Sequence, residues 1–184
     1  MAYGILNWTT TMLTAAGFKL ADAGAVISVA GITSMVGSVG AGLLTRRFGS
    51  KLVMAGISVG LVVLLIGSCF VVQTLPAMPT YEERMVVMIL IGALAAVFSA
   101  GIATMYVIMA VGYPQSCRSA GIGFGIFMSR VGAVLASAFG GTLLNIGKGS
   151  VIPFFSVLGI SAVLVSAAAF IVDRHVPPLK KAAA

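Results

Sequence analysis

Charged side chains are scarce in this chain. They make up 8% of its 184 residues, and the chain has only four acidic residues and a single histidine. A soluble globular domain has about 25% charged residues, so a soluble fold would have to bury nearly the whole chain. Hydrophobic residues reach 60%, and the mean hydropathy is +1.15. This composition predicts an all-α, polytopic integral membrane protein whose solvent is the lipid bilayer.

Other shortages exclude several functions. The two cysteines, Cys69 and Cys117, lack metal-site spacing and are expected at opposite membrane faces, so we predict no metal, no cofactor and no disulfide. The net charge of +7 comes from scattered basic residues without interleaved aromatics, which argues against nucleic acid as a partner. No Asp, Glu or His falls inside a predicted span. The sequence therefore predicts no enzymatic activity, and the chain by itself offers no ordinary proton carrier.

Six apolar segments form a single predicted transmembrane domain. Five of them reach the length of about 20 residues that a span needs, whereas the first is short and polar. Most prolines fall in the short connectors, where a missing N–H costs little, and this supports the same division. The predicted spans cover residues 2–16, 22–45, 51–72, 85–111, 119–145 and 151–172, and a tail at 173–184 follows.

Lys and Arg are distributed unevenly between the two sets of connectors. The connectors after the second and fourth spans, together with the tail, hold seven, whereas the alternate connectors hold three. Basic connectors tend to stay on the cytoplasmic side of a membrane. The bias therefore predicts a multi-pass protein of the cytoplasmic (plasma) membrane with its C-terminus in the cytoplasm.

Arg130 lies in the middle of the fifth predicted span. It follows Arg118 by twelve residues, which is about 18 Å along a helix and close to the centre of a hydrocarbon core of about 30 Å. A charge at that depth costs about 2.5–3.5 kcal/mol on insertion scales, and all four acidic residues lie at span ends or in connectors, so none reaches it. Two interpretations stay open. The guanidinium faces an anion, since its planar fork suits a carboxylate, or neighbouring helices satisfy it.

Weaker candidates for a substrate-binding surface are polar or aromatic residues on the same or other spans. One shares the helical face of Arg130, and the others could line a cavity or serve packing and hydrogen bonding between helices. These candidates are Phe127 beside Arg130, Asn7, Trp8 and Thr11 on the first span, and Ser99 and Tyr106 on the fourth.

Small residues recur on another face of the fifth span. Gly121, Gly125, Ser129 and Gly132 follow a helical spacing, and the stripe continues to Gly140. Such stripes let helix backbones approach closely in lipid, so this face is expected to pack.

Several stretches resemble the major facilitator superfamily of transporters. The segment GLLTRRFGSK resembles the family's short cytoplasmic loop motif, although a base stands where the family has an acid. YPQSCRSAGIG at 113–123 looks like the start of the family's eleventh helix. SRVGA at 129–133, followed by a glycine pair, resembles that helix in the aromatic acid:proton symporter branch. LNW at 6–8 looks like that branch's seventh helix. The loop-motif residues are Gly42, Arg46, Arg47, Gly49 and Lys51.

The resemblance implies that the six spans correspond to helices seven to twelve, the C-terminal half of a major facilitator fold. It also implies a partner: a second six-helix bundle, either the missing N-terminal half or another chain. The implied function is proton-coupled transport of a small organic, aromatic carboxylate, with Arg130 holding the carboxylate and Trp8 and Phe127 as aromatic contacts. Two alternatives stay open: a truncated, non-transporting remnant, or a membrane scaffold that binds another protein through the glycine stripe.

Overall fold

A computed structural model describes residues 2–15, 17–74, 80–146 and 152–171. These residues form six α-helices and no strand, which confirms the all-α fold class. The tail at 173–184 and the side chain of Asn7 lie outside the described part of the chain. The helices are α1 (Ala2–Ala15), α2 (Leu20–Phe48), α3 (Ser50–Thr74), α4 (Tyr81–Gly112), α5 (Arg118–Ile146) and α6 (Ile152–Ile171).

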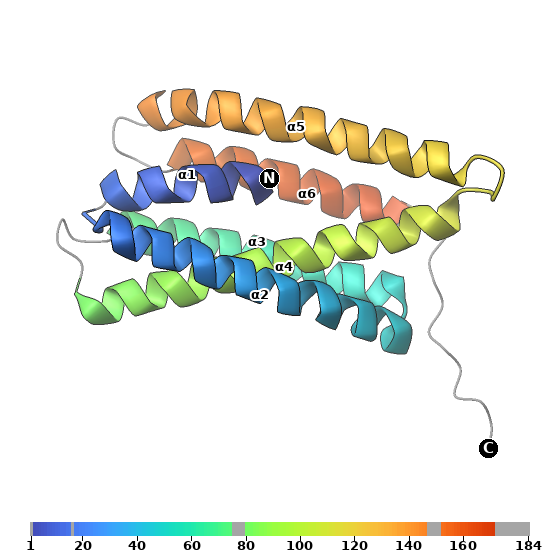
Figure 1. The fold of residues 1–184 in the computed structure, drawn as a ribbon, viewed down its shortest axis with the longest axis horizontal. Helices are drawn as coiled ribbons and strands as arrows, with labels where there is room; N and C mark the ends of the chain where they lie inside the picture. Colours follow the sequence, from blue (N-terminus) through green and yellow to red (C-terminus); the bar gives the residue numbers. More distant parts are fainter. Residues whose placement is uncertain (1, 16, 75–79, 147–151, 172–184) are drawn as a thin grey trace, which may run out of the picture.

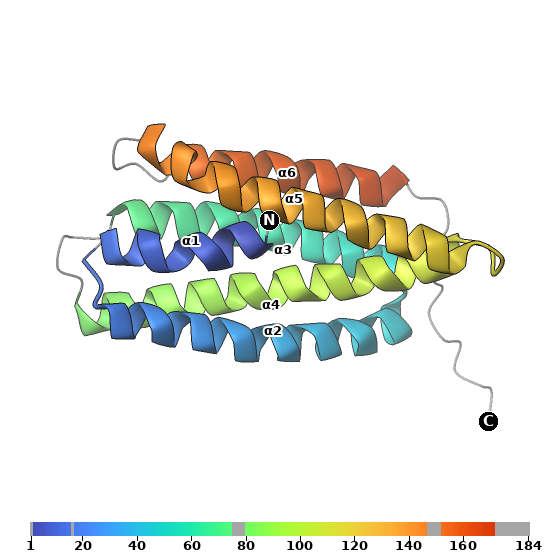
Figure 2. The same cartoon turned by 45° about the horizontal axis from the view of Figure 1, so that its top comes forward.

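The helices lie side by side along the long axis of the molecule and alternate in direction (Figures 1 and 2). Helices α2 to α5 contain stretches long and apolar enough to cross a membrane, and α6 contains a shorter apolar stretch. Helix α1 has 14 residues and covers only about half the length of the bundle (Figure 1). The chain is therefore a multi-pass membrane protein built as a helical bundle.

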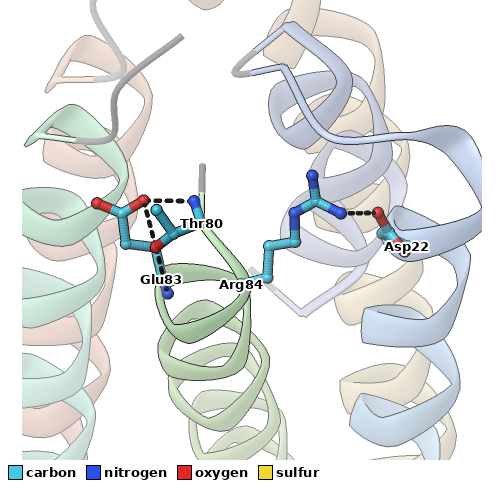
Figure 3. A network of polar contacts seen from close by, with 4 residues as sticks. All are labelled: Asp22, Thr80, Glu83 and Arg84. Atoms are coloured by element: carbon cyan, nitrogen blue, oxygen red, sulfur yellow. Dashed lines mark hydrogen bonds and ion pairs between the residues drawn. The ribbon is translucent and has the colours of Figure 1, made fainter. Parts of the chain in front are cut away.

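Helices α2 and α4 extend furthest beyond the apolar segments that predict them, because local capping extends the helix into polar sequence. Helix α4 begins at Tyr81 rather than at residue 85, since Thr80 and Glu83 form a capping box. The Thr80 backbone N–H donates to the Glu83 carboxylate at 2.7 Å (Figure 3). Helix α2 continues to Phe48, past residue 45, and ends where Gly49 adopts φ 81° and donates its N–H to the Thr45 carbonyl.

An ion pair joins α2 to α4 at the same end of the bundle as this capping box (Figure 3). The Arg84 guanidinium donates to the Asp22 carboxylate at 2.7 Å. It also lies 5.9 Å from the ring centroid of Phe18, a buried residue of the link between α1 and α2. One arginine thus ties the start of α4 to the start of α2 and to the link that precedes α2.

The tightest helix contact is between α2 and α4. A Cβ at Gly37 would overlap the backbone of Ala96, so glycine allows the two helices to approach this closely. Hydroxyl groups of α2 bond to α4 along the same contact: Thr33 donates to the Gly92 carbonyl at 2.7 Å, and the Ser38 and Ser99 hydroxyls lie 2.6 Å apart. Polar groups and small residues therefore hold this pair, as is common for helices in lipid.

The buried apolar side chains of the described residues form three clusters. The largest joins α1, α3, α4 and α6 around Leu94, Phe98 and Phe154. The second joins α1, α2 and α4 around Leu13 and Val26, and a small third one joins α3 and α4. None of these clusters includes a residue of α5, which lies at the edge of the bundle in Figure 1.

Candidate functional site on the uncovered face of α5

The other five helices leave most of α5 uncovered. Between Arg118 and Thr142, Gly140 alone is buried among the described residues. Exposed apolar side chains are ordinary on a helix that faces lipid. An exposed arginine in the middle of such a helix is not, because hydrocarbon does not solvate a charge.

Arg130 lies on this uncovered surface and is itself exposed. Phe127 and Val134, which flank it at helical spacing on the same face, are 58% and 67% exposed. The side of α5 around Arg130 therefore presents one cation among apolar and aromatic side chains. A guanidinium in that setting can hold a carboxylate by two parallel hydrogen bonds while an aromatic ring packs beside it.

Trp8 fastens the second half of α5 to α1. Its indole N–H donates to the Ser137 carbonyl at 3.2 Å, and the half-buried ring lies against Gly140 and Gly141. A Cβ at either glycine would overlap the indole, so the glycine pair provides the space for it. These contacts match the packing interpretation of Trp8, and the role of the ring toward a planar ligand stays a prediction.

The predicted glycine stripe divides into a packed part and an open part. Gly121 lies against the Tyr113 ring and Gly125 against the Met109 sulfur, both near the end of α4. Gly132 has no atom within 4 Å of where its Cβ would be, and it is exposed, as is Ser129. The Ser129 hydroxyl donates to the carbonyl of Ile126 within its own helix.

The remaining candidate side chains are dispersed. Ser99 is half-buried and bonds to Ser38 in the α2–α4 contact, which matches the helix–helix alternative. Tyr106, two turns further along α4, is 41% exposed. Thr11 is exposed on α1, while Asn7 precedes it on a part of the helix whose side chains are not described. In the described structure Phe127 therefore lies on the same uncovered face of α5 as Arg130, and Ser99 lies in the α2–α4 contact instead.

The residues of the loop motif lie at the junction of α2 and α3. Gly42, Arg46, Arg47 and Lys51 are exposed, and the Arg47 guanidinium lies 5.4 Å from the ring centroid of Phe48. Gly49 is buried, and its positive φ makes the turn between the helices possible. Sequence reasoning assigned this segment to a family motif and did not foresee that its cation would stack on a helix-end phenylalanine.

Charge is unevenly distributed between the two ends of the described bundle. The end with the α2–α3 and α4–α5 connections carries Arg46, Arg47, Lys51 and Arg118 and no acidic residue in the described part of the chain. The opposite end carries the described acids, Asp22, Glu82 and Glu83. The described residues contain no group of His, Cys, Asp and Glu side chains that could hold a metal ion.

Comparison with known proteins gives one informative relative. No protein-family model matches the chain, and no solved structure matches it. The chain is 29% identical over 174 residues to the benzoate transport protein of Acinetobacter baylyi (strain ATCC 33305 / BD413 / ADP1). The match covers 94% of this chain and 35% of the relative, so the chain spans about a third of that protein's length. A helical membrane bundle similar to a transport protein agrees with the prediction that the chain is not an enzyme.

Proposed function

We propose that the chain is the C-terminal half of a major facilitator transporter that moves a small aromatic carboxylate together with a proton. The observation that carries this proposal is the position of Arg130, exposed at mid-span on the face of α5 that the other helices leave open. The similarity to a benzoate transport protein supports an aromatic carboxylate as the anion.

A second six-helix bundle completes the site in this proposal. Without it, the Arg130 face would contact hydrocarbon, at a cost of about 2.5–3.5 kcal/mol for the charge alone. A facing bundle would enclose a midplane cavity between two repeats, which is where secondary transporters bind their substrates. The described acids lie in the first turns of α2 and α4, far from mid-span, so the proton carrier belongs to the second bundle.

Within this cavity Arg130 binds the substrate carboxylate through its two-pronged guanidinium, and Phe127 offers its exposed ring to the aromatic part of the substrate. Rocking of one bundle against the other then opens the cavity to each side of the membrane in turn. The basic end, with its α2–α3 connection and the chain's C-terminus, faces the cytoplasm of the plasma membrane in this proposal.

A chimera tests the proposal. In it, this chain replaces the matching 35% of the Acinetobacter benzoate transport protein, in cells without benzoate uptake of their own. We expect uptake of labelled benzoate above that of the vector control and a loss of about tenfold or more in Arg130→Met, since charge-assisted hydrogen bonds contribute about 1.5–3 kcal/mol. Arg130→Lys keeps the charge without the fork and should fall between the two.

Several outcomes separate the proposal from its alternatives. Equal uptake in the parent chimera and Arg130→Met would remove Arg130 from the site. A chimera that reaches the membrane but takes up no benzoate favours a non-transporting remnant or a scaffold. Uptake by this chain expressed alone would contradict the requirement for a second bundle.

A further inference from the structure

A cavity of about 460 Å³ lies between α2, α3 and α4, and none of its lining residues belongs to α5. All the residues that line it are apolar. Gly40 on α2 and Gly56 on α3 leave the space open, because no atom lies within 4 Å of where their Cβ atoms would be. Leu44 and Leu52 on its rim are 48% and 67% exposed, so the cavity opens sideways from the bundle. At the surface of membrane-spanning helices, this opening faces the acyl chains of the bilayer.

The cavity has a basic end. Phe48, the last residue of α2, lines it, and the Arg47 guanidinium lies 5.4 Å from the centroid of that ring. Arg46 and Lys51 are exposed on either side of the same turn. The nearest acid along α2 is Asp22, which precedes Arg46 by 24 residues, or about 36 Å of helix. Three cations therefore meet at one end of an apolar groove, without a nearby acid on α2 to neutralise them.

The length of the groove corresponds to one leaflet. From Phe48 back to Gly37, its lining on α2 runs over eleven residues, or about 16 Å. The hydrocarbon core is about 30 Å thick, so the groove extends from the membrane boundary to near its midplane. An acyl chain lying in it places its headgroup beside the three cations.

We propose that this groove is a binding site for one anionic phospholipid. The acyl chain lies between α2 and α3 over the small residues, and the headgroup phosphate accepts hydrogen bonds from Arg46, Arg47 or Lys51. Basic sites at the ends of membrane helices bind anionic headgroups in this way, and arginine is suited to phosphate. The site is separate from the Arg130 face and requires no substrate transport.

Native mass spectrometry of the purified chain, with equal phosphatidylglycerol and phosphatidylcholine added, tests the proposal. We expect one phosphatidylglycerol to stay bound in preference to phosphatidylcholine. Gly40→Leu or Gly56→Leu should remove this bound lipid, because both positions line the groove and a Cβ at either one meets no atom within 4 Å, so the added side chain occupies groove space. Gly31→Leu is the matched control, since it adds the same side chain at an open, exposed position of α2 outside the groove.

The headgroup is tested by charge removal. Arg46→Gln, Arg47→Gln and Lys51→Gln, singly and together, should lower the preference for phosphatidylglycerol by about fivefold for each charge. Lys19→Gln, at the opposite end of the bundle, should leave the preference unchanged. Circular dichroism of every variant separates a lost site from a lost fold.

Three results would overturn the proposal. The first is lipid retention unaffected by both Gly40→Leu and Gly56→Leu in folded protein. The second is an equal loss in Gly31→Leu or Lys19→Gln, which would indicate non-specific lipid around the bundle. The third is dissociation of a second copy of this chain, rather than of lipid, when the groove is filled, which would make the groove a helix-docking surface. Because the readout is bound lipid, failure of the lipid proposal would not change the expected benzoate uptake. Failure of the transport proposal would likewise not change the expected lipid binding.

Discussion

Helix pair α2–α4 and helix α5 contain similar residues, but among the described residues only the pair packs a small residue against the backbone of a partner helix. All three helices are long and apolar, and α2 and α5 are rich in glycine. In the α2–α4 pair, the small residues meet a partner backbone, as Gly37 meets Ala96, and hydroxyl groups bond across the contact. In α5, the middle of the glycine stripe meets no other helix, and Arg130 is exposed close by.

The difference indicates which helix faces have a packing partner within the described bundle and which do not. In lipid, helices associate through close packing and hydrogen bonds rather than through exclusion of water, so a small-residue face gains stability only when a partner covers it. The α2–α4 pair has that partner within this chain. The uncovered middle of α5 has none among the described residues, and we propose that the second bundle covers the face of α5 that carries Arg130.

The largest expected change in the free energy of unfolding is at the α2–α4 contact. Gly37→Leu would force a side chain into the backbone of Ala96, which cannot rotate away, and overpacking costs about 1–3 kcal/mol of unfolding free energy. Gly31→Leu on the same helix meets open space and should change the unfolding free energy by less than about 0.5 kcal/mol. Unfolding in mixed detergent micelles, followed by circular dichroism, measures both. Equal effects would mean that this contact does not hold the bundle.

A smaller effect is expected where Trp8 holds α5. Gly140→Leu overlaps the indole, which is a side chain and can move, so we expect a loss of about 1–2 kcal/mol. In the Trp8→Ala background the same change should cost much less, and Gly132→Leu should cost little in either background. A double-mutant cycle on unfolding free energies measures this coupling. Additive losses would show that Trp8 and Gly140 act independently.

The smallest expected loss of unfolding free energy is at the ion pair between Asp22 and Arg84. The Asp22 and Arg84 side chains are 38% and 33% exposed, so solvent screens their attraction, and Asp22→Asn should cost no more than about 1 kcal/mol. Exchanging the two residues should restore part of that loss, and added salt should shrink the difference between the parent and Asp22→Asn. A loss of several kcal/mol would mean that the pair is far less solvated than its exposure indicates.

Hydropathy and proline positions predicted six helices, because a span must be apolar along its whole length. The ends were less predictable: Thr80 and Glu83 carry a capping-box spacing in the sequence, yet hydropathy alone began the helix at residue 85. Periodicity separated the Arg130 face of α5 from its glycine face. It could not reveal that Ser99 would meet Ser38, or that Trp8 would lie on Gly140, because one helix's sequence does not specify its neighbours.

The most direct measurement is the reactivity of a cysteine one turn beyond Arg130. In the benzoate chimera, with other cysteines replaced, Val134→Cys is compared with Val63→Cys on α3, since both valines are similarly exposed in this chain, at 67% and 62%. A charged, water-borne thiol reagent should modify Val134→Cys, benzoate should slow that reaction, and Val63→Cys in lipid should stay unmodified. If Val134→Cys stays unmodified as well, or reacts at the same rate with and without benzoate, the open face of α5 does not line a substrate cavity.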